Sequence, residues 1–406
     1  MKILLSAFQC RPGRGSEFAT GWHWATTLTE YGHEVTVLTG SDSRDSIVAD
    51  GTCGADFRYI DFPDTRLSRV PQVRWHDVYR LWQKEALKHA EGLRQDYDVI
   101  HHVTWGGLHL GSHLWRLPAP MIYGPAGGGQ IAPARYWRYF GRDWPMETLR
   151  TAATGSLLQL NSTCRSTIQN SAVTLVTNSA TAAAVRRLGG RDVRFMLADG
   201  LPTAWLGEPR PQPAGVPVVL WVGRLLPRKA PVLAVEAFAQ LRRAMPARLV
   251  IAGDGPMERQ VREAIDRLGV AADVQMLGHV TLAEVKPLYD SASVLLFPSL
   301  RESFGAPFLE ALGRGLPTVA LNLGGIADAD VGPAAVKVDL PPEPRDLPAL
   351  VGSALQAVLS DGTWEARSAA AVSWASGWVW PAKIAAATEI YKELAASHGA
   401  GGRPVT

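Results

Sequence analysis

Short apolar runs alternate with longer amphipathic stretches along most of the chain. Lys2–Phe8, with Ile3, Leu4 and Leu5 at its centre, is the first of these runs. Further apolar runs cover residues 34–39, 57–60, 99–103, 121–123, 173–177, 193–197, 218–222, 249–252, 274–277, 294–297 and 318–321. Runs that are apolar throughout are typical of parallel strands buried on both faces. With helices between them, they predict α/β domains built on doubly wound parallel sheets.

Residues 206–217 (LGEPRPQPAGVP) interrupt this alternation with four prolines and no hydrophobic periodicity. Such a segment is typical of a linker between domains. We therefore expect a Rossmann-like N-terminal domain at 1–205 and a similar C-terminal domain at 218–373. Ligands of such paired domains bind in a cleft between them. The aromatic-rich residues 374–406 are expected to form a C-terminal helix.

Composition narrows the class of protein further. The 406 residues are 47% hydrophobic and 19% charged, which is typical of globular domains large enough to form their own cores. A net charge of +3 gives no support for a nucleic-acid partner. Three scattered cysteines predict neither a disulfide framework nor a metal cluster. No apolar stretch is long enough to span a membrane, and a cytoplasmic location is the default expectation.

The stretch Phe297–Gly315 (FPSLRESFGAPFLEALGRG) carries the clearest candidate site. A strand ends at Pro298, and a helix is expected from about Ala306, because proline is favoured in the first helical turn. The backbone amides before such a helix bind anions. Glu302 and Glu310 would be unfavourable beside an anion, unless the ligand also offers hydroxyl groups. A sugar joined to a diphosphate and a ribose offers both kinds of group.

A second candidate stretch follows the strand at 218–222. Gly223-Arg224-Leu225-Leu226-Pro227-Arg228-Lys229 places cations at the carboxyl end of a strand. The guanidinium of Arg224 can bind phosphate oxygens through two nitrogens, and Lys229 adds a point charge. Arg228 is a weaker candidate for the role of Lys229.

These motifs resemble those of the family-4 glycosyltransferases, which are retaining enzymes with the GT-B fold. ESFGAPFLE matches the E-x7-E signature, and residues 223–230 match G-R-L-x-x-x-K-G, except that Ala230 replaces the last glycine. The resemblance implies that Glu302 contacts the donor sugar and Glu310 the ribose. It also implies that the C-terminal helix returns to the N-terminal domain. The implied donor-binding residues are Gly15, Arg224, Lys229, Leu277, Glu302, Ser303, Phe304, Gly305, Ala306 and Glu310.

The acceptor side is expected on two loops of the N-terminal domain, one at His101–Gly107 and one at Gly124–Gln130. Many family members carry an H-x-H pair here, but in this chain the histidines are adjacent and Val103 takes the second position. His102 and Thr104 are candidates for the catalytic role, and His101 is expected to be a buried core residue. The remaining acceptor-side candidates are Gly127, Gly128 and Gly129, which could also serve a tight turn.

Residues 134–150 interleave four arginines with five aromatic residues. This pattern fits a segment that lies at the inner face of a membrane as a peripheral contact. It equally fits an acceptor-cleft wall, or a helix whose aromatics pack inward. The sequence does not choose among these three interpretations.

The resemblance predicts a retaining glycosyltransferase with Glu302, Arg224, Lys229 and His102 as catalytic residues. The donor would be a nucleotide sugar of UDP or GDP type, and the acceptor a hydroxyl of a small natural product or an envelope glycan. No cofactor and no metal are expected. The alternatives are a sugar-nucleotide epimerase and a non-catalytic sugar-nucleotide binding protein on the same fold.

Overall fold

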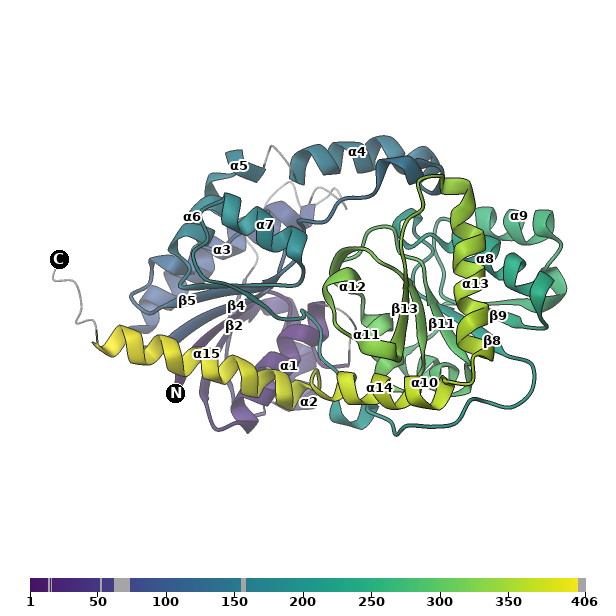
Figure 1. Ribbon diagram of the computed structural model, residues 1–406. Helices are drawn as coiled ribbons and strands as arrows, with labels where there is room; N and C mark the ends of the chain where they lie inside the picture. Colours follow the sequence, from purple (N-terminus) through teal and green to yellow (C-terminus); the bar gives the residue numbers. More distant parts are fainter. Residues whose placement is uncertain (14, 16, 52, 62–73, 155–157, 401–406) are drawn as a thin grey trace. The chain divides into compact units, whose positions relative to one another are not determined.

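The computed structural model describes residues 1–13, 15, 17–51, 53–61, 74–154 and 158–400. These residues divide into two compact units, each with one parallel sheet (Figure 1). Unit 1 comprises Met1–Gly129, Ala153–Gly200 and Trp380–Thr406, and unit 2 comprises Gln130–Ala152 and Leu201–Val379. The predicted α/β class is confirmed, and every strand range expected from the apolar runs is found within one to three residues at each end.

The seven-stranded sheet of unit 1 has the order β3-β2-β1-β4-β5-β6-β7. Its strands are β1 (Lys2–Ala7), β2 (Glu34–Gly40), β3 (Asp56–Ile60), β4 (Val99–Thr104), β5 (Met121–Ala126), β6 (Val173–Val176) and β7 (Val193–Phe195). Its helices are α1 (Glu17–Glu30), α2 (Arg44–Asp50), α3 (Arg74–Leu93), α5 (Leu158–Leu160), α6 (Ser162–Asn170), α7 (Ser179–Arg187) and α15 (Trp380–Ala400). All pairings in this sheet are parallel, and the strand order changes direction between β1 and β4. Ligands of doubly wound folds bind at such a point.

Side chains of β1 alternate between two buried clusters, one on each face of this sheet. Leu4 belongs to one cluster, while Ile3 and Leu5 belong to the other. The second cluster also contains Ile384 and Tyr391 of α15, so the C-terminal helix completes the core of unit 1. Figure 1 shows α15 in yellow running beside α1. This confirms the predicted return of the C-terminal helix to the first domain.

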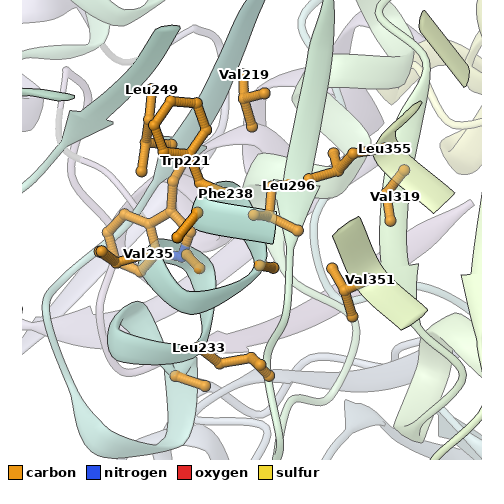
Figure 2. Close-up of a cluster of buried hydrophobic side chains, with 14 of the residues drawn as sticks. Val219, Trp221, Leu233, Val235, Phe238, Leu249, Leu296, Val319, Val351 and Leu355 are labelled. Carbon is orange, nitrogen blue, oxygen red and sulfur yellow. The ribbon is translucent and has the colours of Figure 1, made fainter. Parts of the chain in front are cut away.

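The six-stranded sheet of unit 2 has the order β10-β9-β8-β11-β12-β13. Its strands are β8 (Val218–Val222), β9 (Arg248–Ala252), β10 (Val274–Gly278), β11 (Val294–Phe297), β12 (Thr318–Leu321) and β13 (Ala335–Val338). Its helices are α4 (Trp144–Ala152), α8 (Pro231–Ala244), α9 (Glu258–Leu268), α10 (Leu282–Ser291), α11 (Ala306–Gly313), α12 (Gly324–Asp328), α13 (Leu347–Ser360) and α14 (Trp364–Ser376). Figure 2 shows its core, where Trp221, Phe238 and Leu296 lie with side chains of α13.

Two boundaries differ from the expected ones. The aromatic and arginine-rich segment was expected within the N-terminal domain, but Gln130–Ala152 belongs to unit 2. The reason is packing, because Tyr136, Tyr139 and Phe140 are buried in the core of unit 2. At the other end, the expected continuous helix from residue 374 is broken. α14 ends at Ser376 in unit 2, and α15 begins at Trp380 in unit 1.

Candidate functional site

The loop between β11 and α11 has the conformation that the sequence predicts. β11 ends at Phe297, and α11 begins at Ala306 with Pro307 in its first turn. Gly305 precedes the helix with φ of 102°, a region that side chains other than hydrogen disfavour. A Cβ atom at Gly305 would also lie 2.5 Å from the ring of Phe297. Glycine is therefore required for the sharp turn that delivers the loop to the start of α11.

Glu302 is the most strongly paired residue of this loop. Its Oε2 atom lies 2.8 Å from a guanidinium nitrogen of Arg228 and also forms an ion pair with the ammonium group of Lys229. Burial alone would raise the pKa of Glu302, but the two cations outweigh it and lower the pKa below its ordinary value. Glu302 is therefore a carboxylate at neutral pH, and its side chain is only 15% exposed.

Backbone contacts hold the two cations beside the loop. Arg228 and Lys229 lie in a 3₁₀ turn, Pro227–Lys229, and the carbonyl oxygen of Arg228 accepts a 2.8 Å hydrogen bond from the amide of Leu300. The next residue, Ala230, is buried and has a left-handed φ of 47°. This is the position where the family motif has glycine, and the chain adopts the glycine-like conformation with alanine.

Glycines also join the loops that follow β8 and β9. A Cβ atom at Gly253 would lie 1.9 Å from the carbonyl oxygen of Gly223, and one at Gly255 would lie 2.8 Å from the backbone of Leu225. Between these contacts, Arg224 is exposed, and its side chain makes no hydrogen bond or ion pair with the residues described. The guanidinium thus stands at the carboxyl edge of the sheet on a rigid backbone.

A second glycine pair supports the Glu302 backbone. Gly324 and Gly325 open α12, and the amide of Gly325 donates to the carbonyl oxygen of Ser303 at 2.9 Å. Cβ atoms at Gly324 and Gly325 would lie 2.3 Å and 2.1 Å from the carbonyl oxygens of Glu302 and Ser303. The close approach of α12 therefore fixes the backbone on which Glu302 stands.

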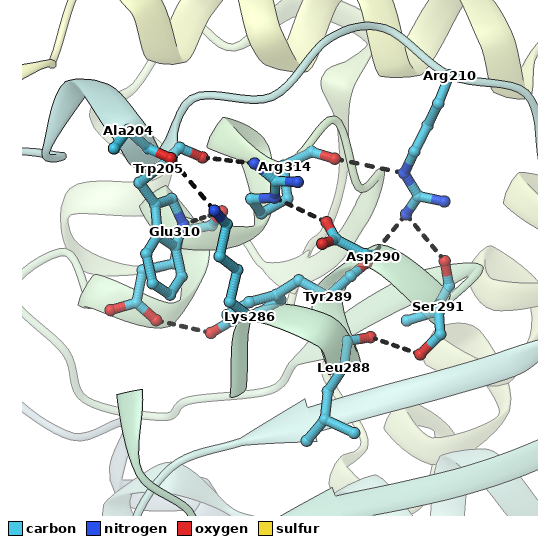
Figure 3. A network of polar contacts seen from close by, with 11 residues as sticks. Ala204, Trp205, Arg210, Lys286, Leu288, Tyr289, Asp290, Ser291, Glu310 and Arg314 are labelled. Carbon is cyan, nitrogen blue, oxygen red and sulfur yellow. Dashed lines mark hydrogen bonds and ion pairs between the residues drawn. The ribbon is translucent and has the colours of Figure 1, made fainter. Parts of the chain in front are cut away.

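Glu310 lies on α11, and residues other than those that hold Glu302 fix its position. The hydroxyl of Tyr289 donates a 2.8 Å hydrogen bond to its Oε2 atom, and the indole of Trp205 donates to its backbone carbonyl at 3.2 Å. Figure 3 shows these contacts within a larger network, in which Arg314 forms a 2.7 Å ion pair with Asp290. Tyr289 is completely buried, so one carboxylate oxygen of Glu310 is held by the core of unit 2.

The other predicted donor-binding residues of unit 2 offer mainly backbone groups at the candidate site. The ring of Phe304 is buried and stacks on Trp374 at 5.8 Å, so its side chain belongs to the core. The amide of Ser303 donates to Oε1 of Glu302 at 3.3 Å. Leu277 is half-buried in β10, one residue before Gly278, whose carbonyl accepts from Gly253 at 2.7 Å. Ala306 is the first residue of α11.

The two adjacent histidines of β4, His101 and His102, are both completely buried. His101 contacts the Tyr391 hydroxyl and the Gly124 carbonyl, each at 2.7 Å, as its predicted core role requires. Both ring nitrogens of His102 are also occupied, by the hydroxyls of Ser6 and Tyr79 at 2.9 Å each. Burial lowers the pKa of His102 to about 4, so it is neutral at physiological pH. This differs from the catalytic role expected for His102, because a residue so enclosed presents no free nitrogen to a ligand.

The remaining acceptor-side candidates also have structural partners. Thr104 is completely buried, and its hydroxyl donates to the carbonyl of Gln9 at 3.2 Å. Gly129 packs on the start of α7, where a Cβ atom would lie 2.5 Å from the backbone of Thr181. Gly127 forms a bridge with Gly107, and Gly128 has φ of 118°. Gly15 is exposed, while its neighbours Arg14 and Ser16 lie outside the described residues.

Sequence reasoning missed Glu17, the first residue of α1. Burial and the neighbouring Asp199 raise the pKa of Glu17 to about 7, against a lowering contribution from the backbone amide of Gly106. Acidic residues are common at helix N-termini because they interact favourably with the helix dipole. The position of Glu17 in the sequence therefore gives no specific indication of function. Glu17 follows β1 and Gly106 follows β4, which puts both at the reversal point of the first sheet.

The described part of the chain contains neither a metal-binding cluster nor a membrane-spanning helix. No group of three or more His, Cys, Asp or Glu side chains there is arranged to hold a metal ion. Among the helices described, none is both long enough and apolar enough to cross a membrane.

The part of unit 2 that carries the candidate donor-binding residues matches a known family model. Residues 208–330, which carry Arg224, Lys229, Glu302 and Glu310, match the family model of the glycosyl transferases group 1. An uncharacterised glycosyltransferase of Methanocaldococcus jannaschii is 37% identical over 111 residues, which are 27% of this chain and 28% of the relative. A D-inositol 3-phosphate glycosyltransferase of Kineococcus radiotolerans is 33% identical over 211 residues, 47% of this chain and 48% of the relative. The chain thus spans about half or less of the length of these relatives.

Solved structures match over nearly the whole chain. Sucrose-phosphate synthase from Thermosynechococcus elongatus aligns with a TM-score of 0.69 at 18% identity, covering 98% of this chain and 99% of that one. HepE of Anabaena, crystallised in complex with UDP, aligns with a TM-score of 0.64 at 17% identity, covering 97% and 100%. The chain therefore has the GT-B fold, and residues 208–330 carry the sequence pattern of the group 1 glycosyl transferases.

Proposed function

We propose that this protein is a glycosyltransferase that transfers a sugar from a nucleotide-diphosphate donor to a hydroxyl acceptor, with retention of anomeric configuration. The observation that carries the proposal is the pairing of Glu302 with Lys229 and Arg228, at the start of the helix that also bears Glu310. Two cations and two carboxylates are thereby gathered on the family-matched part of unit 2, and such groups are suited to bind a diphosphate and to accept from sugar hydroxyls.

In the proposed mechanism, unit 2 binds the donor. Arg224 and Lys229 bind the diphosphate, together with the backbone amides of Ser303–Ala306 at the start of α11. Negative charge grows on the diphosphate as the bond to the sugar breaks. Preorganised cations and amides stabilise that charge, which lowers the barrier without a metal ion.

The two glutamates have separate proposed roles. Glu302 accepts hydrogen bonds from the hydroxyls of the transferred sugar and stabilises its developing positive charge. Glu310 accepts from the ribose, with Tyr289 holding its other oxygen. Leu277, at the end of β10, is proposed to lie beside the base.

Retention is proposed because Glu302 is a poor nucleophile. A carboxylate paired with two cations has its charge neutralised and is not free to attack the anomeric carbon. The acceptor hydroxyl would instead attack from the face that the leaving group occupies, and the departing phosphate would take its proton.

The proposed metal independence can be tested directly. Turnover should survive EDTA, and activity that EDTA abolishes and magnesium or manganese restores would contradict it.

In unit 1, the proposed acceptor contacts are backbone groups of Gly127, Gly128 and Gly129. His102 and Thr104 are not retained in the proposal, because both are completely buried and already bonded. A cytoplasmic location, with a peripheral membrane contact through residues 134–150, is part of the proposal. Three exposed apolar side chains of this segment support that contact, namely Trp137, Met146 and Leu149.

A thermal-shift panel of UDP-sugars and GDP-sugars tests the proposal. A ligand at 100 times its dissociation constant adds about 2.7 kcal/mol of stability, which is readily measured. The complex of Anabaena HepE with UDP-glucose supports giving UDP-sugars the first place in the panel. A donor that stabilises the protein should then be turned over only with an acceptor or, slowly, with water. Conversion of the sugar without any transfer would indicate an epimerase, and binding without turnover a non-catalytic binding protein.

A further inference from the structure

Glu302 has two cationic partners, whereas the family motif accounts for only one. Lys229 occupies the lysine position of the motif, and Arg228 stands one residue before it. Arg228 reaches Oε2 of Glu302 at 2.8 Å with good hydrogen-bond geometry. Its guanidinium is also 3.5 Å from the carbonyl of Arg301, one residue before Glu302. Arg228 thus faces the carboxylate and the backbone that carries it.

A donor diphosphate and the Glu302 carboxylate are both anions, and both need the ammonium group of Lys229. The ammonium group of Lys229 is a point charge on a flexible side chain. It can therefore be shared between the two anions, or turn from one to the other, at little cost in free energy. If Lys229 turns to the phosphate, Glu302 loses part of its neutralisation while it stays mostly buried. Arg228 has the planar, permanently charged group that can hold the carboxylate alone.

Among the residues that the structure describes, no other nearby cation can replace Arg228 in this role. Arg301, next to Glu302 in the chain, directs its charge to Glu147 of α4, with 2.5 Å between Nε and Oε1. Both of these side chains are about nine-tenths buried. On the other flank, α12 approaches with Gly324 and Gly325, which carry no charge, and its Asp328 influences Lys337. The charges that act on Glu302 are therefore those of Lys229 and Arg228.

We propose that Arg228 is a positioning residue, which holds the Glu302 carboxylate in place and ionised while Lys229 serves the donor diphosphate. This inference rests on the proposed function. It assigns Arg228 a task different from the phosphate contact that its sequence position suggests. The backbone carbonyl of Arg228 accepts a hydrogen bond from Leu300. This contact holds the turn beside the loop and does not depend on the side chain at position 228.

The test compares Arg228→Gln and Arg228→Lys with a control, Arg243→Gln, an exposed arginine on α8. With a donor that is turned over, Arg228→Gln should lower kcat about 10- to 100-fold, the range expected for losing a hydrogen bond to a charged group. The donor KM should change less than threefold, and Arg228→Lys should recover part of kcat. The acidic limb of the pH profile of kcat should move to higher pH, because Glu302 loses one of its cations.

A second measurement does not depend on activity. Carbon-13 NMR titration of the glutamate carboxyls, with Glu302 assigned through Glu302→Gln, should show its pKa rising in Arg228→Gln and staying unchanged in Arg243→Gln. An unchanged Glu302 titration would overturn the positioning role, even if the protein is a glycosyltransferase. If the Glu302 pKa rose in Arg228→Gln but the protein turned over no nucleotide sugar, the interaction of Arg228 with Glu302 would be supported. The proposed function would then be refuted. If instead the donor KM rose tenfold or more and kcat stayed intact, Arg228 would be a phosphate-binding residue and not a positioning residue.

Discussion

The Tyr289 hydroxyl donates a 2.8 Å hydrogen bond to the Glu310 carboxylate, from a side chain that is completely buried (Figure 3). A buried donor with a fixed ring orients its acceptor, because the tyrosine cannot rotate away. The core of unit 2 thereby sets the direction of the other carboxylate oxygen of Glu310, Oε1. In the proposed mechanism, that oxygen accepts from the ribose of the donor.

Tyr289→Phe removes this hydrogen bond and leaves the ring packing intact. We expect the donor KM to rise about 10-fold, the low end of the range for hydrogen bonds to charged groups, with kcat nearly unchanged. Two donors with the same base and different sugars should be affected equally. Steady-state kinetics on Tyr289→Phe, with Tyr97→Phe as a control, check this. A loss confined to kcat would mean that Glu310 does not act in donor binding.

Arg224→Gln tests the phosphate contact. Arg224 is exposed and makes no hydrogen bond or ion pair with the described residues, so the melting temperature should stay the same. Affinity for a nucleotide sugar should fall roughly 10- to 100-fold, while the free nucleoside should bind as before because it lacks the diphosphate. Calorimetric titration with both ligands measures the difference. Equal losses for the two ligands would show that Arg224 does not bind phosphate.

The buried Lys383 gives unit 1 a characteristic pH dependence. Burial lowers the pKa of Lys383 from 10.5 to about 7, although Asp199 opposes the shift, and its ammonium group lies over Trp380 at 4.3 Å. Between pH 7 and 10.5 the unfolded chain therefore binds the additional proton. Stability should rise with pH in that window, by at most about 1.4 kcal/mol per pH unit.

Urea unfolding of the wild type and Lys383→Met at pH 7.5 and 9.0 isolates this contribution. Burial raises the pKa of the Cys10 and Cys164 thiols in the folded protein, so their ionisation in the unfolded chain near pH 9 lowers stability. That contribution is the same in both proteins and cancels in the comparison. The raised pKa of Glu17 acts in another window, since its destabilising effect develops between pH 4.5 and about 7. The wild type should gain more stability than the variant over the two pH values. A parallel change in both proteins would show that Lys383 stays charged in the folded protein.

The regular elements were predictable because fully apolar runs and helix-start signals are local. The strand ranges and the start of α11 at Ala306 needed no knowledge of the rest of the chain. β13 (Ala335–Val338) was missed, because it has only four residues, one of them Lys337, and forms an edge strand. The break between α14 and α15 was missed for a related reason. Gly377 carries a weak stop signal, and the change of unit is decided by packing.

The candidate site was predictable only in part. Glycines at 305, 253 and 324 are explained by close backbone approaches, and a sequence shows that glycine is present without showing what it approaches. The burial of His102 between Ser6 and Tyr79 depends on contacts from β1 and α3, far away in sequence. The same holds for Gln130–Ala152, whose aromatic residues were ambiguous until Tyr136 and Tyr139 were placed in the core of unit 2. Arg228 and Lys229 are adjacent cations in the sequence, which does not show that both pair with Glu302.

The most direct test of the account is steady-state kinetics on Glu302→Gln and Glu310→Gln, with two donors that share a base and differ in the sugar. Glutamine keeps the size of each side chain and removes its charge. Glu302→Gln should lose mainly kcat, because the positive charge on the sugar develops only in the transition state. Glu310→Gln should raise the donor KM equally for both sugars. A strongly sugar-selective loss in Glu310→Gln, with none in Glu302→Gln, would contradict the assignment of Glu302 to the sugar and Glu310 to the ribose.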